Sequence, residues 1–159
     1  MKHYEESVLV DASPKEIFDY VDNHLNFSSH MNKSSWMIGG GKMETELDSR
    51  QGKVIGSHIK MGGNVLGINL FLDEVITERV PPFRKAWKTV GIPRLLVIGA
   101  YELGFEIIKD QEKSRFKVFI NYDLPKGFLT NLLGHLFGEI YAKWCVHQMI
   151  QSTQVFIES

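Results

Sequence analysis

The sequence predicts one α+β domain: a curved antiparallel sheet of seven strands around a long C-terminal helix, with two short helices after the first strand. Residues 41–124 alternate between apolar and polar side chains with a period of two, which indicates strands with one buried face. Residues 127–156 instead carry apolar side chains at helical spacing. A long helix cannot bury itself, so we expect the sheet to curl around it. No linker or repeat divides the chain, and we assign residues 1–159 to a single domain.

The start of the chain predicts a strand over residues 4–10 and then two short helices. Ser13 is placed to cap the first helix, because its hydroxyl can accept a hydrogen bond from the third amide of the helix. Glu16 can reach back to the cap, and Pro14 suits the first turn because its missing N–H costs nothing there. Residues 24–31 are expected to form the second short helical segment.

Six further strands are expected in the middle of the chain, over residues 43–47, 52–61, 65–80, 84–90, 101–107 and 116–122. Residues 62–64 predict a turn between the second and third of these, and residues 91–93 predict a connection. Pro81 and Pro82 end the longest strand, because proline cannot donate to a ladder inside a sheet. We expect a bend in that strand near residues 73–74. Short connections make the sheet an antiparallel meander, which should twist.

The last helix carries apolar side chains on two different sides. At about 100° per residue, one broad face is shared by Leu129, Leu132, Leu133, Leu136, Phe137, Ile140 and Trp144. Beyond Trp144 the apolar positions move to the other side, where Cys145 and Ile150 lie. Either the helix bends near Gly138 or its two halves bury against different surfaces, and we predict that its first half covers the mouth of a cavity and its second half packs on the sheet. Gly134 and Gly138 each cost about 1 kcal/mol relative to alanine, which indicates close approach of another backbone or a flexible lid.

The composition is ordinary for a globular protein and argues against several classes of function. The net charge is −1 and there is no basic block, so we expect no nucleic-acid partner. No run of about 18 apolar residues occurs, so we expect no integral membrane segment. Residues 1–6 lack the apolar run of a secretory signal, and Cys145, the only cysteine, cannot form an internal disulfide. These features predict a cytoplasmic protein.

Three segments resemble one known superfamily. Residues 10–21, VDASPKEIFDYV, resemble its opening strand and helix, residues 81–87, PPFRKAW, resemble one of its hairpins, and residues 122–125, YDLP, precede the last helix as they do there. This is the START, polyketide cyclase/dehydrase and lipid-transport superfamily, related to the birch-pollen allergen. Residues 141–145, YAKWC, are similar to a bacterial subgroup of it. The resemblance covers essentially the whole chain and implies the helix-grip fold. It implies little about chemistry, because the superfamily includes lipid carriers, hormone receptors, ring-closing enzymes and chaperone activators.

The expected architecture leaves a hollow between helix and sheet, which predicts a container for an apolar molecule. Our first hypothesis is binding or transport of a small hydrophobic ligand (a lipid, a sterol-like molecule or a polycyclic aromatic) in a cavity above about 300 Å³. The second is an enzyme resembling the polyketide cyclases and dehydratases, which would need a convergent acid–base pair. The third is an interaction module whose pocket is filled by its own side chains. We favour the first, without a cofactor, and leave a weak homodimer open.

The candidate ligand-binding residues combine apolar side chains with aromatic or imidazole groups whose polar ends could orient a ligand. They are Trp36, His58, Trp87, Tyr101, Leu103, Phe105, Val118, Ile120, Tyr122, Leu133, Leu136, Ile140 and Trp144. For Trp36, Trp87, Tyr101 and Tyr122, ordinary core packing is an equally good interpretation. His58 lies in a strand, where an exposed or hydrogen-bonded histidine is commoner than one that faces a cavity.

No catalytic residue is identified from the sequence. Glu102 and Glu106 share one face of a strand, but the alternation places them opposite the large apolar side chains, so we expect them in solvent. The histidines lack metal-ligand spacing, so no metal site is expected. Cys145 has no basic neighbour that would activate it as a nucleophile. The glycines at residues 39–41 precede a strand, and we interpret them as a loop at the cavity rim instead of a phosphate site.

Overall fold

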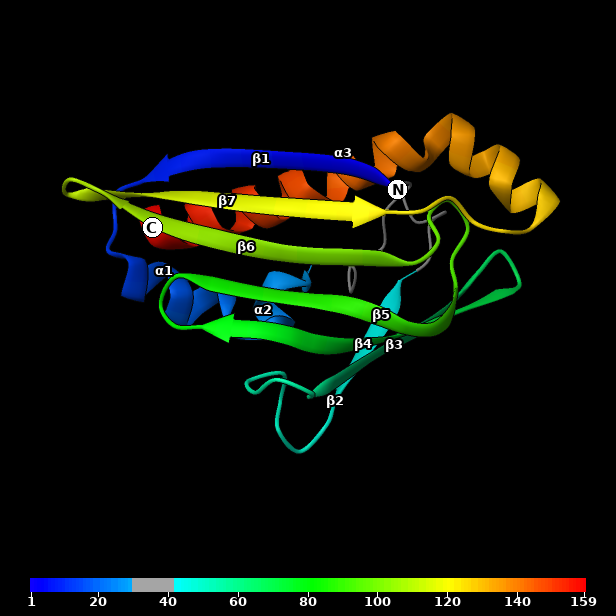
Figure 1. Ribbon diagram of the computed structural model, residues 1–159, viewed down its shortest axis with the longest axis horizontal. Coiled ribbons are helices and arrows are strands. Elements are labelled where there is room, and N and C mark those ends of the chain that lie inside the picture. The colour runs from blue at the N-terminus through cyan, green and yellow to red at the C-terminus, as the bar shows by residue number, and fades with distance from the viewer. Residues whose placement is uncertain (30–41) are drawn as a thin grey trace.

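A computed structural model describes residues 1–29 and 42–159 and confirms the predicted α+β architecture (Figure 1). The elements, in chain order, are β1 (Lys2–Val10), α1 (Pro14–Val21), α2 (His24–Phe27), β2 (Met43–Leu47), β3 (His58–Val65), β4 (Ile68–Val80), β5 (Arg84–Arg94), β6 (Tyr101–Asp110), β7 (Lys113–Tyr122) and α3 (Phe128–Glu158). The described part of the chain thus contains the seven strands, the two short helices after β1 and the long C-terminal helix that the sequence predicts.

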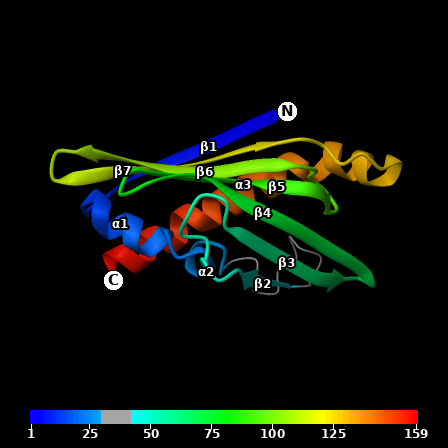
Figure 2. The ribbon, with the colours of Figure 1, turned by 60° about the horizontal axis from the view of Figure 1, so that its bottom comes forward.

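The strands form one antiparallel sheet in the order β1-β7-β6-β5-β4-β3-β2. The first strand therefore closes one edge beside the last, while β2 to β7 follow one another as the predicted meander. Figure 2 shows the sheet curving from β1, β7 and β6 down to β3 and β2, with the helices on the inside of the curve. The register between β4 and β5 shifts between Phe71 and Asp73 and again between Ile76 and Glu78. Such bulges bend a strand, and the first lies beside the bend that we predicted.

The first helix begins as the sequence predicts. The Glu16 amide donates to Ser13 Oγ at 3.3 Å, and the Ser13 amide donates to Glu16 Oε2 at 2.8 Å, which completes a capping box. The helix buries Pro14, Ile17, Phe18 and Val21. The second helix, α2, ends at Phe27, so it is shorter than predicted, and residues 30–31 of that prediction lie outside the described residues.

A buried ion-pair network ties the short helices to the sheet. Asp22, at the end of α1, accepts hydrogen bonds from Arg79 Nε at 3.0 Å and Arg79 Nη2 at 2.8 Å. Lys85 is fully buried and donates to Asp22 Oδ1 at 3.0 Å and to the Asp22 carbonyl at 2.9 Å. Burial opposes ionisation of Asp22, but the hydrogen bonds from Arg79 and Lys85 outweigh it and lower the pKa of that carboxyl. The network fixes the α1–α2 corner over β4 and β5.

Two predicted turns are strands in the structure. We predicted a turn at residues 62–64, but β3 continues to Val65, and the chain turns at Leu66 and Gly67 instead, with φ of 51° and 80°. A Cβ at Gly63 would overlap the Lys42 carbonyl, so this glycine permits close pairing with the start of β2. Similarly β5 continues through the connection predicted at residues 91–93 as far as Arg94. In both places the glycine lies inside a strand: Gly63 permits close pairing with the neighbouring strand, and Gly91 lies in the bulge of β5.

The C-terminal helix is continuous from Phe128 to Glu158 and lies along the inside of the sheet (Figures 1 and 2). Its buried residues are Gly134, Gly138, Tyr141, Ala142, Cys145, Val146, Met149, Ile150 and Thr153. A Cβ at Gly138 would lie 2.8 Å from the Val97 carbonyl, so the missing side chain lets the helix pack on the backbone between β5 and β6. This confirms the close approach that the glycine spacing predicted. Of the described helices, none is long and apolar enough to cross a membrane.

The predicted role of the first half of α3 is wrong. Leu129, Leu132, Leu136 and Ile140 were expected to cover a cavity, but they are 66%, 51%, 59% and 51% exposed. The physical reason is the rotation of the helix. Its second half is held by large buried side chains such as Val146 and Ile150, and the first half follows that rotation, which turns its glycines inward and its leucines outward.

Candidate functional site

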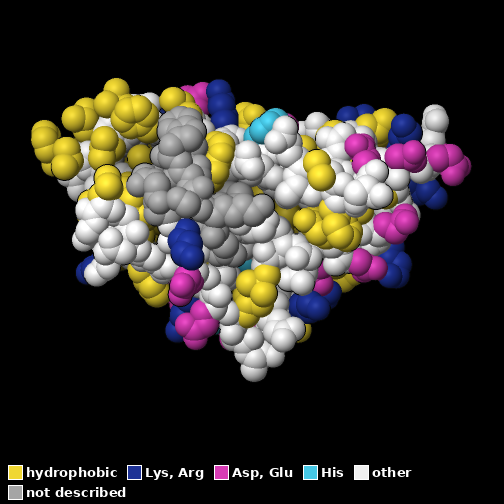
Figure 3. All heavy atoms as spheres, turned by 180° about the vertical axis from the view of Figure 1, so that it is seen from behind, with side chains coloured by type: hydrophobic (Ala, Val, Ile, Leu, Met, Phe, Trp, Pro, Cys, Tyr) yellow, Lys and Arg dark blue, Asp and Glu magenta, His cyan; other side chains and the backbone are white. Residues whose placement is uncertain are grey.

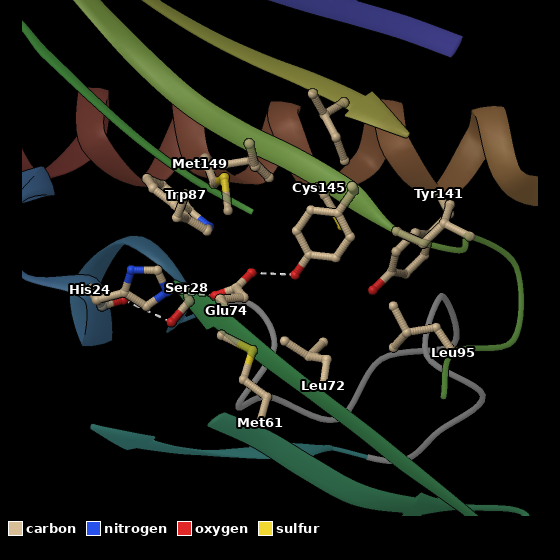
Figure 4. A pocket seen from close by; sticks show the side chains of 14 residues that line it. His24, Ser28, Met61, Leu72, Glu74, Trp87, Leu95, Tyr141, Cys145 and Met149 are labelled. Atoms are coloured by element: carbon tan, nitrogen blue, oxygen red, sulfur yellow. Dashed lines mark hydrogen bonds and ion pairs between the residues drawn. The ribbon is translucent and has the colours of Figure 1, made fainter. Parts of the chain in front are cut away.

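The interior pocket lies between the middle of α3 and the inner face of the sheet (Figure 4). Strands β3 to β7, the β5–β6 connection, α2 and α3 all contribute side chains to its wall. Most of the wall is apolar, and Met61, Leu72, Leu95 and Met149 are representative of it. A few polar groups interrupt this surface, which is the composition typical of a small-molecule site.

The most unusual residue of the pocket is Glu74 in β4. Its side chain is only 2% exposed, and Figure 4 shows it pointing into the pocket among apolar neighbours. Alternation explains the placement: Leu70, Leu72, Glu74 and Ile76 point to the same face of β4, and all four are buried. A carboxylate in such surroundings is costly unless other groups bind it.

Two side chains from other elements meet Glu74. The Tyr101 hydroxyl, from β6, donates a hydrogen bond to Glu74 Oε1. His24, from α2, is 2% exposed, and its Nε2 lies 3.4 Å from Glu74 Oε2, within ion-pair distance. That oxygen nevertheless has no hydrogen-bond partner among the described residues, because the approach of His24 is not aligned as a hydrogen bond. One oxygen of Glu74 is therefore satisfied and the other is open to a further donor.

The aromatic surroundings hold His24 in place. Its ring packs edge-on against Trp87, with centroids 5.0 Å apart and ring planes at 74°. Trp87 is itself 1% exposed and also contacts Phe27 edge-on, with centroids 5.8 Å apart. Packing against Trp87 thus limits how the imidazole can turn, and its Nε2 lies 3.4 Å from the Glu74 carboxylate.

The hydroxyl and thiol groups of the pocket stay protonated at neutral pH. Burial raises the pKa of Tyr101 well above its usual value, and the charge and hydrogen bond of Glu74 add to the rise. Burial likewise raises the pKa of Tyr141 well above its usual value. Burial also raises the pKa of the Cys145 thiol to about 12 and outweighs the hydrogen bond with Tyr141, which lowers it. These three groups can donate hydrogen bonds but are poor bases or nucleophiles at neutral pH.

The cavity that the described residues enclose is small. Its volume is about 40 Å³, room for a few water molecules. This is far below the size of about 300 Å³ at which ligand pockets usually begin, and which we expected from the sequence. In this conformation the space holds no lipid or sterol, and the finding counts against a permanently open container.

Four of the thirteen sequence-predicted site residues line the pocket: Trp87, Tyr101, Leu103 and Ile120. Three others, Phe105, Val118 and Tyr122, are buried in the core but are not part of the pocket wall. His58 lies outside it, because its side chain is 44% exposed and its Nδ1 contacts Asp73 Oδ1 at 2.9 Å.

The predicted residues of α3 do not reach the pocket. Leu136 and Ile140 are more than half exposed, whereas Leu133 and Trp144 are partly buried. Trp36 and the glycines at residues 39–41 lie outside the described residues. The two glutamates, Glu102 and Glu106, lie on the outer face of the sheet, where Glu106 forms ion pairs with Arg84 and Lys117 and Glu102 accepts a hydrogen bond from Asn121.

Sequence reasoning missed Glu74, His24, Tyr141 and Met149 as pocket residues. For Glu74 the signal was present, because its position continues the buried alternation of β4. For His24 no local signal existed, since its burial depends on the packing of a single helical turn against β5. No group of three or more His, Cys, Asp or Glu side chains among the described residues is arranged to hold a metal ion.

Comparison with solved structures identifies the fold. The ZhuI aromatase/cyclase from Streptomyces sp. R1128 superposes with a TM-score of 0.69 at 13% identity, over 99% of this chain and 93% of that one. Norcoclaurine synthase from Thalictrum flavum gives a TM-score of 0.66 at 11% identity, over 99% and 87% of the two chains. Ara h 8.0201 gives a TM-score of 0.63 at 12% identity, over 98% and 97%. No family model matches the chain, and no curated protein matches it. At these identities the likenesses show the fold alone, and it is the helix-grip fold that the sequence resemblance implied.

Proposed function

We propose that this helix-grip protein binds a compact, mainly apolar molecule that carries one hydrogen-bond donor, with Glu74 as the anchor for that donor. The observation that carries the proposal is Glu74 Oε2, a carboxylate oxygen buried in an apolar wall without a hydrogen-bond partner among the described residues. Leaving such an oxygen unsatisfied costs about 1–3 kcal/mol. A ligand hydroxyl or N–H would remove that cost, so the site discriminates in favour of a donor.

The size of the pocket limits the kind of ligand. At about 40 Å³ it admits nothing larger than a few waters unless its side chains move. Met61 and Met149 line it, and methionine side chains adapt readily because they are unbranched and have three rotatable bonds. Their displacement enlarges the space for one ring or a short chain more easily than for a sterol. Within the hydrophobic ligands we predicted, the geometry favours the smallest.

A matched pair of probes tests the proposal. 4-Ethylphenol and ethylbenzene have similar shapes, but only the phenol has a donor. We expect the phenol to shift the amide NMR signals of pocket residues and to bind about 10–100 times more tightly, the ratio given by a hydrogen bond to a charged group. In Glu74→Leu this preference should disappear.

The control variant is Glu102→Gln, a carboxylate on the outer face of the sheet, which should keep the preference of the native protein. Equal affinity for the two probes would remove Glu74 from the proposal. Absence of any signal change up to the solubility limit of both probes would contradict binding in this pocket.

A second candidate function, catalysis resembling that of a polyketide cyclase or dehydratase, is favoured by one observation. Glu74, His24 and the Tyr101 hydroxyl converge on the same small pocket. Such a set can act on a ketone: the carboxylate or the imidazole removes a proton from the carbon beside the carbonyl, and the Tyr101 hydroxyl turns from Glu74 to donate its one hydrogen bond to the enolate oxygen that forms. The raised pKa of Tyr101 keeps that hydroxyl protonated, so its proton is available to donate.

Deuterium exchange tests this second function. Cyclohexanone incubated in D₂O with the protein should lose its α-proton NMR signal faster than in buffer alone, and Glu74→Gln should remove the difference. The Glu102→Gln variant again serves as the control. Exchange no faster than in buffer would leave the binding function alone.

A further inference from the structure

A second apolar surface lies outside the interior, at the end of the molecule where α3 begins. Figures 1 and 2 place the first turns of α3 and the tip of the β3–β4 hairpin at this same end. In Figure 3 hydrophobic side chains gather there. The large exposed apolar residues, which we call the apolar end, are Leu66, Ile68, Ile92, Phe128, Leu129 and Leu132. Phe128, Ile92 and Leu66 are 92%, 90% and 86% exposed, an unusual cost for side chains of this size.

The charges around the apolar end are mainly basic. The segments that carry it, residues 64–71, 90–94 and 122–137, contain the cations Arg94 and Lys126 and a single acidic residue. That residue, Asp123, lies 3.4 Å from the N-terminal ammonium and is thereby compensated. The protein as a whole has a net charge of −1, so the positive charge is a local property of this end.

Lys126 and apolar side chains of α3 share one concave site. Lys126, Phe128, Leu132, Asn131 and His135 line an open surface hollow of about 450 Å³. The Asn131 amide nitrogen already donates to the Pro125 carbonyl at 2.9 Å, which fixes the start of the helix. An anionic group bound beside the Lys126 ammonium would share the hollow with the apolar side chains of Phe128 and Leu132. This pairing of charge and apolar surface matches the headgroup and acyl region of a lipid.

We propose that the apolar end docks on an anionic lipid surface. Its apolar side chains project from separate elements, a hairpin tip, a strand end and the start of a helix. Protruding side chains can each enter a fluid interface, whereas a protein partner would need a complementary shape for all of them at once. Arg94 and Lys126 supply attraction to anionic headgroups. The proposal rests on a surface separate from the interior pocket and is independent of the proposed function.

Vesicle flotation tests the docking. We expect the protein to float with vesicles of phosphatidylcholine and phosphatidylglycerol but not with vesicles of phosphatidylcholine alone, and binding should weaken as salt is added. Leu129→Gln should reduce the affinity about tenfold, because one leucine side chain would no longer be transferred from water into the lipid. Lys126→Glu should reduce it about fivefold for each unit of charge changed. These positions are exposed, so the variants should fold as the native protein does.

Val155→Gln is the matched control, because Val155 lies at the other end of the same helix and is 69% exposed, close to the 66% of Leu129. It should bind vesicles as the native protein does. Binding that is unchanged in Leu129→Gln, or a native protein that floats with neither vesicle, overturns the proposal. Sedimentation is measured in parallel. A native protein that dimerises without binding vesicles, and a Leu129→Gln variant that stays monomeric, would assign the surface to a second copy of the chain and overturn lipid docking.

Discussion

The hydroxyl of Tyr101 in β6 bonds to Glu74 in β4, although β5 separates the two strands in the sheet. Thr89 of β5 stands opposite Glu74 in the register, and its hydroxyl accepts a hydrogen bond from the Tyr101 amide at 3.1 Å. Three adjacent strands therefore determine where the carboxylate lies. Groups held by strands are positioned more accurately than groups on loops, which suits the role that we propose for Glu74.

Removing the Tyr101 hydroxyl should destabilise the fold. In Tyr101→Phe the buried carboxylate of Glu74 loses its hydrogen-bond donor, and we expect the free energy of unfolding in urea to fall by about 1–3 kcal/mol. Tyr4→Phe is the control, because the Tyr4 hydroxyl bonds to Glu6 at 3.3 Å in a partly exposed place, and its loss should cost less than about 0.5 kcal/mol. If the free energy of unfolding fell equally in the two variants, the buried hydrogen bond would stabilise the fold no more than the exposed one.

Breaking the Asp22 network should cost more. Asp22→Ala leaves the fully buried Lys85 without its carboxylate partner, and such a loss typically costs about 3–5 kcal/mol. Adding Lys85→Met removes the stranded charge, so the double variant should recover part of the unfolding free energy. Asp19→Ala removes an exposed pair with Lys15 and should cost no more than about 0.5 kcal/mol. A double variant less stable than Asp22→Ala would contradict this account.

Acid should weaken the loop that Asp48 organises. Its carboxylate accepts hydrogen bonds from Ser57 Oγ at 2.6 Å and from the His58 amide at 2.9 Å, and these bonds lower the pKa of Asp48 from 3.8 to about 2. Because the pKa is lower in the folded protein, the stabilisation is complete above the unfolded value and is lost as pH falls through the folded one.

Urea unfolding measured from above pH 3.8 down to about pH 2 checks this prediction. Asp48→Asn should show a smaller loss of stability across that window than the native protein. Ser57→Ala removes the donor that contributes most and should give an intermediate result. If Asp48→Asn lost as much stability in acid as the native protein, the pH dependence would belong to other groups.

A methyl group on the close-packed side of α3 should be costly. In Gly138→Ala the new Cβ would lie 2.8 Å from the Val97 carbonyl, a backbone atom that cannot turn aside. Alanine gains about 1 kcal/mol of helix propensity, but overpacking usually costs about 1–3 kcal/mol, and we expect a net loss in thermal stability. In Gly62→Ala the nearest atom would be 3.7 Å away, an ordinary contact, and this variant should be close to neutral. A more stable Gly138→Ala would contradict the close packing.

Much of the fold could be read from the sequence because its signals are local. The capping box at Ser13 and Glu16 and the alternation in β6 and β7 specify helix and strand without reference to the rest of the chain. The alternation also selected Leu103 and Ile120 correctly as inward-facing residues of the pocket. The error at residues 62–64 arose because glycine marks both turns and close strand pairing, and only the partner strand distinguishes them.

The site was harder to predict because it depends on rotation and on distant contacts. The first half of α3 is apolar on one side and carries glycines on another, so either side could face the sheet by composition alone. The packing of Val146 and Ile150, several turns further along α3, determines which side of the first half faces the sheet. His24 meets Glu74 across a separation of fifty residues in sequence, and no spacing rule connects them.

The glycines of α3 also bear on how such a chamber could change in evolution. Gly134 and Gly138 let α3 pack directly on backbone atoms, and Tyr141, Cys145 and Met149 of the same helix line the pocket. Larger side chains at those two positions would push α3 away from the backbone at Val97. The pocket would then widen although none of its lining residues had changed. Proteins that evolve from this one could therefore gain space for larger ligands through substitutions at Gly134 and Gly138 alone.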